Sequence, residues 1–534
     1  MVALLLGGAI GSALGSRLRG RVRQKHKGRS SDFAVTAARR LVAPGLVDAH
    51  SVRIWLRTDR PGWHTLTLTS PDGLSETRRF EVRDDPATDG THVVRWPDDV
   101  GAAPLRPGVR YGFDVRHTDG ENVGSGRFVT APLGPDDAHD EFSIAIASCH
   151  QPFEEDGTVR HSSLGLLHSL ETSFEAFNVE QLLLLGDQMY TDLPKHHALF
   201  GNSFKRVAPP GRETVLDCTR AEVRALLQER YRIFWKIAPF ARLQANYATL
   251  CMLDDHEVVD NFGSAPKHAS PEWANYRAGA IDAFHDYQAL RAHDRTPKPT
   301  TFAARFARGP VAGLILDLRT ERVADDDHIR ILGEDQWMLL DRFLVSEGRR
   351  PVLLLGLSVP ILHAPDWLIE TAGHLVPKGG DVSDRWSHPH ARPDLDRLLE
   401  RLRLHREAFP AQKVILLGGD IHVGVVSQLA IGDTGPIFQF VSSAVSNLEK
   451  RINRLASGEL PMITRGTTTE SGLACSFSLV PGVDGRDENP TDALNAGVLT
   501  LRRSGDEWMV RMRIVGHEPG EPLRARVVYD SGEH

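Results

Sequence analysis

Six short apolar runs, each of which ends in polar residues, constrain the possible folds of this chain more than any other feature. They read FSIAIASCHQ, LLLLGDQMY, ATLCMLDDHE, VAGLILDLRT, PVLLLGLSVP and KVILLGGDIH. Longer amphipathic stretches, such as TRAEVRALLQERYRIFWKI and DLDRLLERLRLHREAF, lie between several of them. Apolar strands that alternate with helices predict an α/β domain whose sheet is covered on both faces. In such domains ligands bind beyond the carboxyl ends of the strands, which is where these runs carry their polar residues.

The segment before these runs has a different pattern. SVRIWLRT and VRYGFDVRH alternate apolar and polar residues, and turn sequences such as DRPG and SPDG lie between them. Short strands at this spacing predict a sandwich of the immunoglobulin or fibronectin type. Because 534 residues are too many for one core, we predict three parts. They are a basic tail over 1–44, a small all-β domain over 45–132, and an α/β domain with C-terminal strands over 133–534.

The first residues combine an apolar stretch with cations. ALLLGGAIGSALG is shorter than the roughly 20 residues of a membrane-spanning helix. The basic block RLRGRVRQKHKGR follows it, whereas a secretory signal carries its charges first. We therefore expect a cytoplasmic protein whose tail contacts a membrane surface peripherally, with a disordered extension as the alternative.

Charge and cysteine content narrow the function classes. The formal net charge of -7 argues against bulk electrostatic binding of nucleic acid. The four cysteines show no CxxC spacing, which excludes a disulfide framework and a zinc ribbon. The sequence leaves the oligomeric state open.

Side chains that bind metals gather at four of the six run ends. They are Cys149, Asp187, Tyr190, Asp254, Asp255, His256, Glu257, Asp420 and His422. Taken singly, each has a structural reading, such as a buried cysteine, a turn or a helix N-cap. Together they predict a metal centre, because crowded carboxylates need a cation or must protonate. Ligands of oxygen, nitrogen and sulfur suit transition metals, and carboxylates also suit calcium or magnesium.

The motifs at these ends resemble those of the calcineurin-like metallophosphatases, and in particular of the PhoD-like (alkaline phosphatase D) branch. That branch is similar in reading ASC, GDxxY, DDHE and GDxH in this order. Further similar segments are GRFVTAP, LGEDQWMLLDRFL and SDRWSHPHARPDLDRLL. The resemblance covers roughly residues 45–515. It implies a four-layer α/β sandwich and hydrolysis of phosphate monoesters or diesters by a metal-bound hydroxide at a two-metal centre.

The resemblance also implies which residues hold the metals. Asp187 would bridge the two ions. A ferric iron at the first site would have Cys149, Tyr190 and His422 as further ligands. A divalent cation at the second site would be bound by Asp255 and Asp420. We expect this cation to be Ca²⁺, with Mn²⁺, Mg²⁺ and Zn²⁺ as alternatives.

The same resemblance suggests the catalytic residues. His256 would protonate the leaving group or orient the phosphate. Arg319 would contact phosphate oxygens, or else form a structural pair with Asp317. Asp254 and Asp260-Asn261 would support the ligands or a third metal. Where other branches carry a further histidine ligand, this chain has Ser358, and His363 lies farther along. This departure predicts a second metal that is held differently.

Two other functions are compatible with the motifs. A nuclease would use the same centre together with a basic groove, for which Lys195, Lys205, Arg206 and Arg212 are candidates. We expect these cations to be solvated surface charge instead. A non-catalytic interaction protein on the same fold is the other alternative. The segment 371–393, rich in Gly, Pro and His, is typical of a lid or binding loop. Its candidate ligands, which we expect to be solvated or at a pocket rim, are His374, His388 and His390.

Overall fold

The computed structural model describes most of the chain. The described residues are 38–97, 103–325, 327–365, 367–369, 383–448, 458–462, 464, 473, 475–485, 487–517 and 525–534. The predicted tail up to residue 37, with its proposed membrane contact, and residues 371–382 of the predicted loop therefore lie outside the described residues. Among the described helices, none is both long and apolar enough to cross a membrane.

The N-terminal part is a sandwich of two antiparallel sheets, with strand orders β1-β2-β5 and β4-β3-β6-β7. The strands are β1 (Leu41–Val47), β2 (Val52–Arg57), β3 (Gly62–Thr69), β4 (Ser75–Val82), β5 (Thr91–Trp96), β6 (Arg110–His117) and β7 (Asn122–Val129). Inward side chains of both sheets, such as Ile54 and Val115, share one core. This arrangement confirms the predicted all-β sandwich. Its first strand begins at Leu41, inside the segment that the sequence assigned to the tail.

Two larger sheets form the centre of the α/β part. Their orders are β10-β9-β8-β20-β21-β22 and β11-β12-β15-β16-β18-β17-β19. The strands of the first are β8 (Glu141–Ala147), β9 (Val179–Leu184), β10 (Ala248–Cys251), β20 (Leu494–Ser504), β21 (Glu507–His517) and β22 (Arg526–Glu533). Those of the second are β11 (Ala304–Arg308), β12 (Val311–Ile315), β15 (Val352–Gly356), β16 (Lys413–Gly418), β17 (Val425–Ile431), β18 (Ile437–Val441) and β19 (Cys475–Leu479). All six predicted apolar runs are strands, three in each sheet, and the three in each sheet are parallel.

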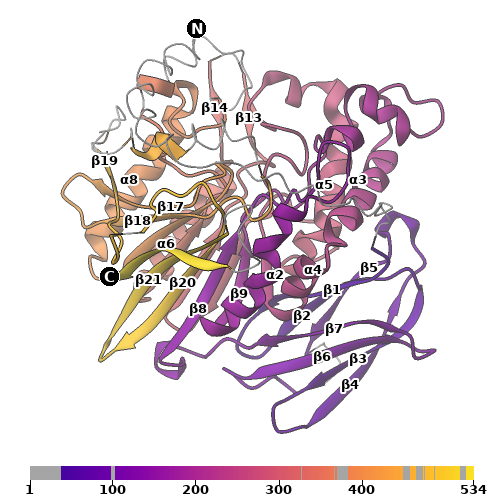
Figure 1. Cartoon of the computed structure of the whole chain (residues 1–534), viewed down its shortest axis with the longest axis horizontal. Coiled ribbons are helices and arrows are strands. Elements are labelled where there is room, and N and C mark those ends of the chain that lie inside the picture. Colours follow the sequence, from indigo (N-terminus) through magenta and orange to yellow (C-terminus); the bar gives the residue numbers. More distant parts are fainter. Residues whose placement is uncertain are drawn as a thin grey trace, which may run out of the picture.

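The two sheets pack face to face and helices cover their outer faces (Figure 1). Leu183 of β9 lies in the core between the sheets, whereas Leu182 and Leu184 lie in the core under the helices of the first sheet. This alternation follows from the two-residue period of a strand and explains why each run is apolar throughout. The result is the predicted four-layer α/β sandwich.

Helices on the first sheet are α2 (His161–Ala176), α3 (Arg220–Trp235), α4 (Ala238–Asn246) and α5 (Ala274–Tyr287). Those on the second are α6 (Glu334–Ser346) and α8 (Arg392–Ala408). A short hairpin, β13 (Val323–Ala324) and β14 (Ile329–Arg330), precedes α6. The two amphipathic stretches quoted above form α3 and α8. A capping box between Thr219 and Glu222 starts α3.

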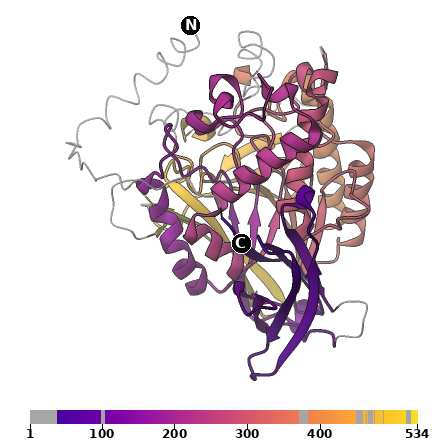
Figure 2. The ribbon, with the colours of Figure 1, turned by 90° about the vertical axis from the view of Figure 1, so that its right-hand side faces the viewer.

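The β-sandwich packs against one end of the α/β part (Figures 1 and 2). Strand β1 contacts β10 and α4. The indole of Trp55 is buried against Trp235 and Tyr287, and its Nε1–H donates to the carbonyl of Asp286 at 2.8 Å. The two parts therefore share a hydrophobic core, which holds the sandwich against the sheet that carries Asp187.

Candidate metal centre

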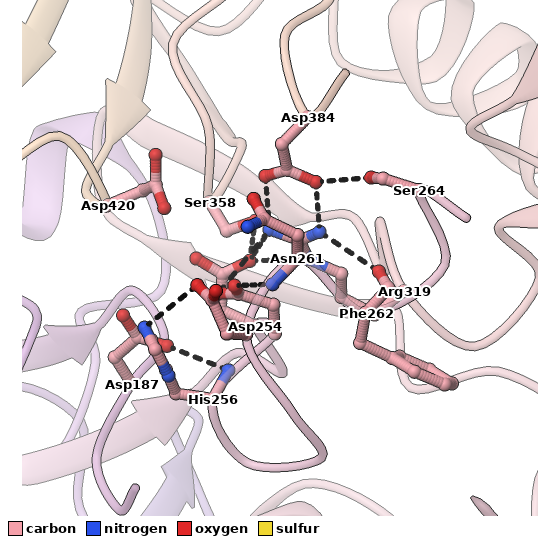
Figure 3. A network of polar contacts seen from close by, with 12 residues as sticks. Asp187, Asp254, His256, Asn261, Phe262, Ser264, Arg319, Ser358, Asp384 and Asp420 are labelled. Atoms are coloured by element: carbon pink, nitrogen blue, oxygen red, sulfur yellow. Dashed lines mark hydrogen bonds and ion pairs between the residues drawn. The ribbon is translucent and has the colours of Figure 1, made fainter. Parts of the chain in front are cut away.

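Strand ends of both central sheets converge on one buried group of acidic, thiol and imidazole side chains. Figure 3 shows the part of this group around Asp187, Asp254 and His256. Potential ligand atoms of Cys149, Asp187 and His422 lie within 4.8 Å of one another. The same holds for a second group, which consists of Asp187, Asp254, Asp255 and Asp420. Because Asp187 belongs to both groups, the geometry fits two neighbouring cations that share its carboxylate.

The backbone at these positions is unusual. Cys149, Asp187, Asp420 and His422 have φ values of 56°, 58°, 63° and 54°, in the left-handed region that non-glycine residues rarely adopt. Such conformations cost free energy and cluster at functional sites. The glycine before Asp187 is required by space as well, since a Cβ on Gly186 would lie 2.4 Å from the Cβ of Asp254.

In the first group, Tyr190 lies next to the shared carboxylate. Its hydroxyl donates to Oδ2 of Asp187 at 3.1 Å, and Sγ of Cys149 is 3.4 Å from the same oxygen. Nδ2 of Asn447 donates to the Tyr190 hydroxyl at 3.2 Å and lies 3.3 Å from Nε2 of His422. Asn447 was not among the site residues predicted from the sequence, although the segment IFQFVSSAVSN is also an apolar run that ends in polar residues.

In the second group, two buried carboxylate oxygens have no hydrogen-bond partner among the described residues, namely Oδ2 of Asp254 and Oδ1 of Asp255. Buried polar atoms are normally paired, so these oxygens are available to a cation. Oδ2 of Asp420 accepts from Arg385. Ser358, which stands near the position of the missing histidine, donates its hydroxyl to Oδ1 of Asp254 at 2.9 Å. It therefore orients one of the carboxylates.

The electrostatics also favour a cation. Burial, and next the neighbouring Cys149, raise the pKa of Asp187 well above its ordinary value. Burial likewise raises the pKa of Asp254 and Asp255, and it raises that of Cys149 to about 12. Without a bound metal ion, burial therefore favours the neutral, protonated forms of these groups. A metal ion would offset this cost, because it binds the deprotonated ligands.

Glu257 connects the two ligand-bearing loops without belonging to either group. Its Oε2 accepts from the backbone N–H of Asp187 at 3.0 Å and from that of Asp254 at 3.1 Å. Its Oε1 accepts from the N–H of Gln188 at 2.7 Å and from Nε2 of Gln288 at 2.9 Å. The final residue of the DDHE motif is therefore a structural link between the two loops.

His256 lies at the edge of the centre and is held by a carboxylate that the sequence analysis did not single out. Its Nδ1 is 2.8 Å from Oδ1 of Asp192, and its ring lies 4.2 Å from that of Tyr190. Burial works against the charged imidazole, but Asp192, Asp255 and Asp187 raise the pKa of His256 well above its ordinary value. Asp192 follows Tyr190 by two residues, within the GDQMYTD segment.

The expectations for Arg319 need correction. Its guanidinium is fully buried, with Nε donating to Oδ1 of Asp254 at 2.6 Å and Nη1 and Nη2 donating to the two oxygens of Asp384 at 2.6 and 2.8 Å (Figure 3). Asp317 accepts instead from the backbone N–H of Arg319 at 3.0 Å. All three guanidinium nitrogens therefore already have protein acceptors, and the side chain does not pair with Asp317. It fixes Asp254, and Asp384 is a further site residue that the sequence analysis missed.

Of the histidines considered as additional ligands, those within the described residues belong to neither of the two groups. His374 is outside the described residues. Nδ1 of His388 accepts from the backbone N–H of His390 at 3.2 Å, and burial lowers the pKa of His388 to about 4. His363 is buried, and burial lowers its pKa to about 3. Among the described residues, none of His363, His388 and His390 joins a group of potential ligands.

The basic residues after GDQMY are partly neutralised by neighbours. Arg212 pairs with Glu222 at 2.9 Å, and Nζ of Lys195 lies 3.8 Å from Glu155. Arg206 donates to the carbonyl of His196 at 3.3 Å. These contacts agree with ordinary surface charge and do not favour the nuclease alternative.

We expect the metal-free protein to lose stability as the pH rises from the ordinary carboxyl pKa of 3.8 towards the raised folded-state values. The folded-state pKa values of Asp187, Asp254 and Asp255 lie above the ordinary 3.8, and that of His256 lies above 6.5. The folded state therefore binds more protons, so stability falls as the pH rises through this window. Added metal should reverse the loss, since it favours the deprotonated carboxylates. Calorimetric melting with EDTA or with metal tests this. A Tm of the EDTA-treated protein that does not change with pH would contradict it.

The comparisons with known proteins agree with this geometry. Residues 144–470 match a family model described as PhoD-like phosphatase. A solved structure of PhoD is similar at 16% identity and a TM-score of 0.61, with 92% of this chain and 88% of that chain covered. The purple acid phosphatase PPD1 from yellow lupin (Lupinus luteus) seeds is similar at 10% identity and a TM-score of 0.51, with 91% and 74% covered. At these identities the structural likeness concerns the fold. The search among curated proteins gives no match.

Proposed function

The chain belongs to the PhoD-like phosphatase family and is a metallophosphoesterase; from this premise we propose that it hydrolyses phosphate monoesters or diesters with a ferric iron and a calcium ion. Asp187 is the main support for this proposal, because it belongs both to the group with Cys149 and His422 and to the group with Asp254, Asp255 and Asp420. A third group of potential ligands joins Asp187 and Asp255 to His256. Cys149, Tyr190 and His422 would complete the iron site, since thiolate, phenolate and imidazole suit a transition metal. Asp255 and Asp420, with Asp254, would hold the calcium ion through hard oxygen ligands.

Two cations held in this way would lower the pKa of a water molecule and neutralise charge on the phosphoryl oxygens. The chain's own contribution to proton transfer comes from His256. The carboxylate of Asp192, which holds Nδ1, raises the pKa of His256 and so favours its imidazolium form. Nε2 is then the atom that donates a proton to the leaving-group oxygen.

Tyr190→Phe tests the iron site. We expect the purified wild-type protein to contain iron and to show a visible phenolate-to-iron charge-transfer band, which the variant loses or shifts. Elemental analysis and the visible spectrum measure both. Tyr231→Phe is the matched control, because Tyr231 is equally buried but its hydroxyl contacts Gln288. This control should keep the band.

Turnover of p-nitrophenyl phosphate and of bis(p-nitrophenyl) phosphate then separates monoesterase from diesterase activity. A protein that takes up neither iron nor calcium, and hydrolyses neither ester, would overturn the proposal. That outcome would favour an interaction protein on this fold.

His256→Gln should lower kcat by about 10²- to 10⁴-fold, the range that a general acid contributes. Metal content should stay the same, because His256 is not among the proposed ligands. The kcat of the wild type should fall as the pH rises through the raised pKa of His256, and that fall should be absent in the variant. Metal loss in His256→Gln, or an unchanged pH profile, would argue against a proton-donating role.

A further inference from the structure

A cavity lies beside the metal centre. Its volume is about 410 Å³, and it is lined by the loop from Phe262 to Ala269, by α5 and by the segment of Thr320 to Ala324 with Arg330. Figure 3 shows the ring of Phe262 directed away from the ligand carboxylates. The Arg319–Asp384 pair stands between the two sites, since Asp384 contacts Arg319 on one side and Arg322 on the other. The metal ligands described above do not use this cavity.

Two residues in the wall of the cavity, Thr320 and Arg322, carry buried donors that lack acceptors. The side chain of Arg322 is fully buried, and its Nη2 lies 3.3 Å from both Oδ1 of Asp384 and the carbonyl of Ser383. Its Nε and Nη1, like the hydroxyl of Thr320, are buried without a hydrogen-bond partner among the described residues. Leaving such donors unpaired is costly, above all on a charged group. An acceptor that enters the cavity would remove this cost.

Two further guanidinium groups line the same cavity. Nη1 of Arg277 donates to the carbonyl of His268 at 2.9 Å, and Nη2 of Arg330 to the carbonyl of Glu321 at 3.4 Å. Each of these hydrogen bonds uses one nitrogen of a planar, five-donor group. Glu321 is the one carboxylate among the lining residues, and its Oε2 already accepts from the N–H of Gly333 and from Gln336. The cavity is therefore positively charged and rich in donors.

We propose that this cavity binds a phosphate-type oxyanion, separately from the metal centre. Several guanidinium groups around a small volume are suited to the charge and the multiple acceptor oxygens of such an anion. The anion is either free phosphate or a second phosphate of the substrate. Only the second possibility rests on the proposed function.

Calorimetric titration of the metal-loaded protein with inorganic phosphate tests the site. We expect two classes of binding site in the wild type. The double variant Arg277→Gln/Arg330→Gln should weaken one class by at least about tenfold, because two charge-assisted hydrogen bonds are removed. Arg397→Gln/Arg401→Gln, which removes the same charge from α8, is the matched control and should keep both classes. Arg322→Lys is a second test and should weaken the same class, provided that its melting temperature matches the wild type.

Three results would overturn the site: a single class in the wild type, an unchanged two-class isotherm in the cavity variant, or equal weakening in the control. The source of the anion follows from kinetics on a phosphate monoester and an alkyl bisphosphate. A KM that rises in the cavity variant for the bisphosphate alone assigns the site to the substrate. If the cavity variant has the same KM as the wild type for each of the two compounds, but has lost one class of phosphate site in the calorimetric titration, the site is assigned to free phosphate. If the protein hydrolyses no ester, the calorimetric result still decides, because it does not depend on turnover.

Discussion

Replacing Asp187 by asparagine should remove nearly all phosphoester hydrolysis, with kcat/KM lower by about 10³-fold or more. Asparagine has nearly the same shape but no negative charge, and Asp187 belongs to both groups of potential ligands. One substitution therefore weakens both cation sites. The loop itself should persist, because the backbone N–H of residue 187 is still held by Glu257. Elemental analysis should show loss of both metals from a folded protein.

Asp286→Asn is the matched control for this variant. Asp286 is fully buried like Asp187, but it pairs with Arg224 and Arg295 and belongs to no group of potential ligands among the described residues. Its loss should lower the melting temperature while turnover per folded molecule and metal content remain. An Asp187→Asn protein that retains full metal content and activity would contradict the shared-carboxylate geometry.

Asp384→Asn should destabilise the protein by about 3–5 kcal/mol, the usual cost of breaking a buried ion pair from one side. Asp384 is the carboxylate that both Arg319 and Arg322 contact, and all three side chains are almost completely buried. Although burial opposes ionisation, the two arginines hold the pKa of Asp384 well below its ordinary value. Its contribution is therefore present above the ordinary pKa of 3.8 and is lost as the pH falls towards the lowered folded-state value.

Thermal and denaturant unfolding measure this effect, with Asp341→Asn as the control. Asp341 pairs with Arg401 at the surface, where its carboxylate is 48% exposed. An exposed pair contributes about 0–1 kcal/mol, so this control should change stability little. If Asp384→Asn were as mild as the control, the two arginines would have other partners, and the assignment of Arg319 as a positioning residue for Asp254 would be wrong.

Local sequence patterns predicted the strands, the helices and the family of this protein. Runs such as LLLLGDQMY are strands because they are short, apolar and followed by turn residues, and these properties are encoded within a few neighbouring positions. The helices at Arg220–Trp235 and Arg392–Ala408 follow from their apolar period and, for the first, from a capping box. The family also followed from motif order, since ASC, GDxxY, DDHE and GDxH stand at successive strand ends.

The sequence did not predict which strands and side chains that are distant in the chain pair with one another. The sequence of a strand that is apolar on both faces does not indicate which other strand pairs with it. Six such runs could therefore have formed one sheet, whereas in the structure they belong to two sheets. For the same reason the partner of Arg319 was misjudged. Asp317 is its neighbour in sequence, but Asp384, 65 residues away, is its neighbour in space.

By itself, therefore, the sequence determined the strand and helix types, the candidate ligands and the metallophosphatase family, because each depends on residue type and short spacing. Only the tertiary structure decided that Asp187 belongs to two ligand groups, that Ser358 and Arg319 orient Asp254, and that Asp192 holds His256. Only it showed the donors left unpaired around Arg322. These features depend on distances between side chains from different strands and loops, which exist only once the two sheets have packed face to face.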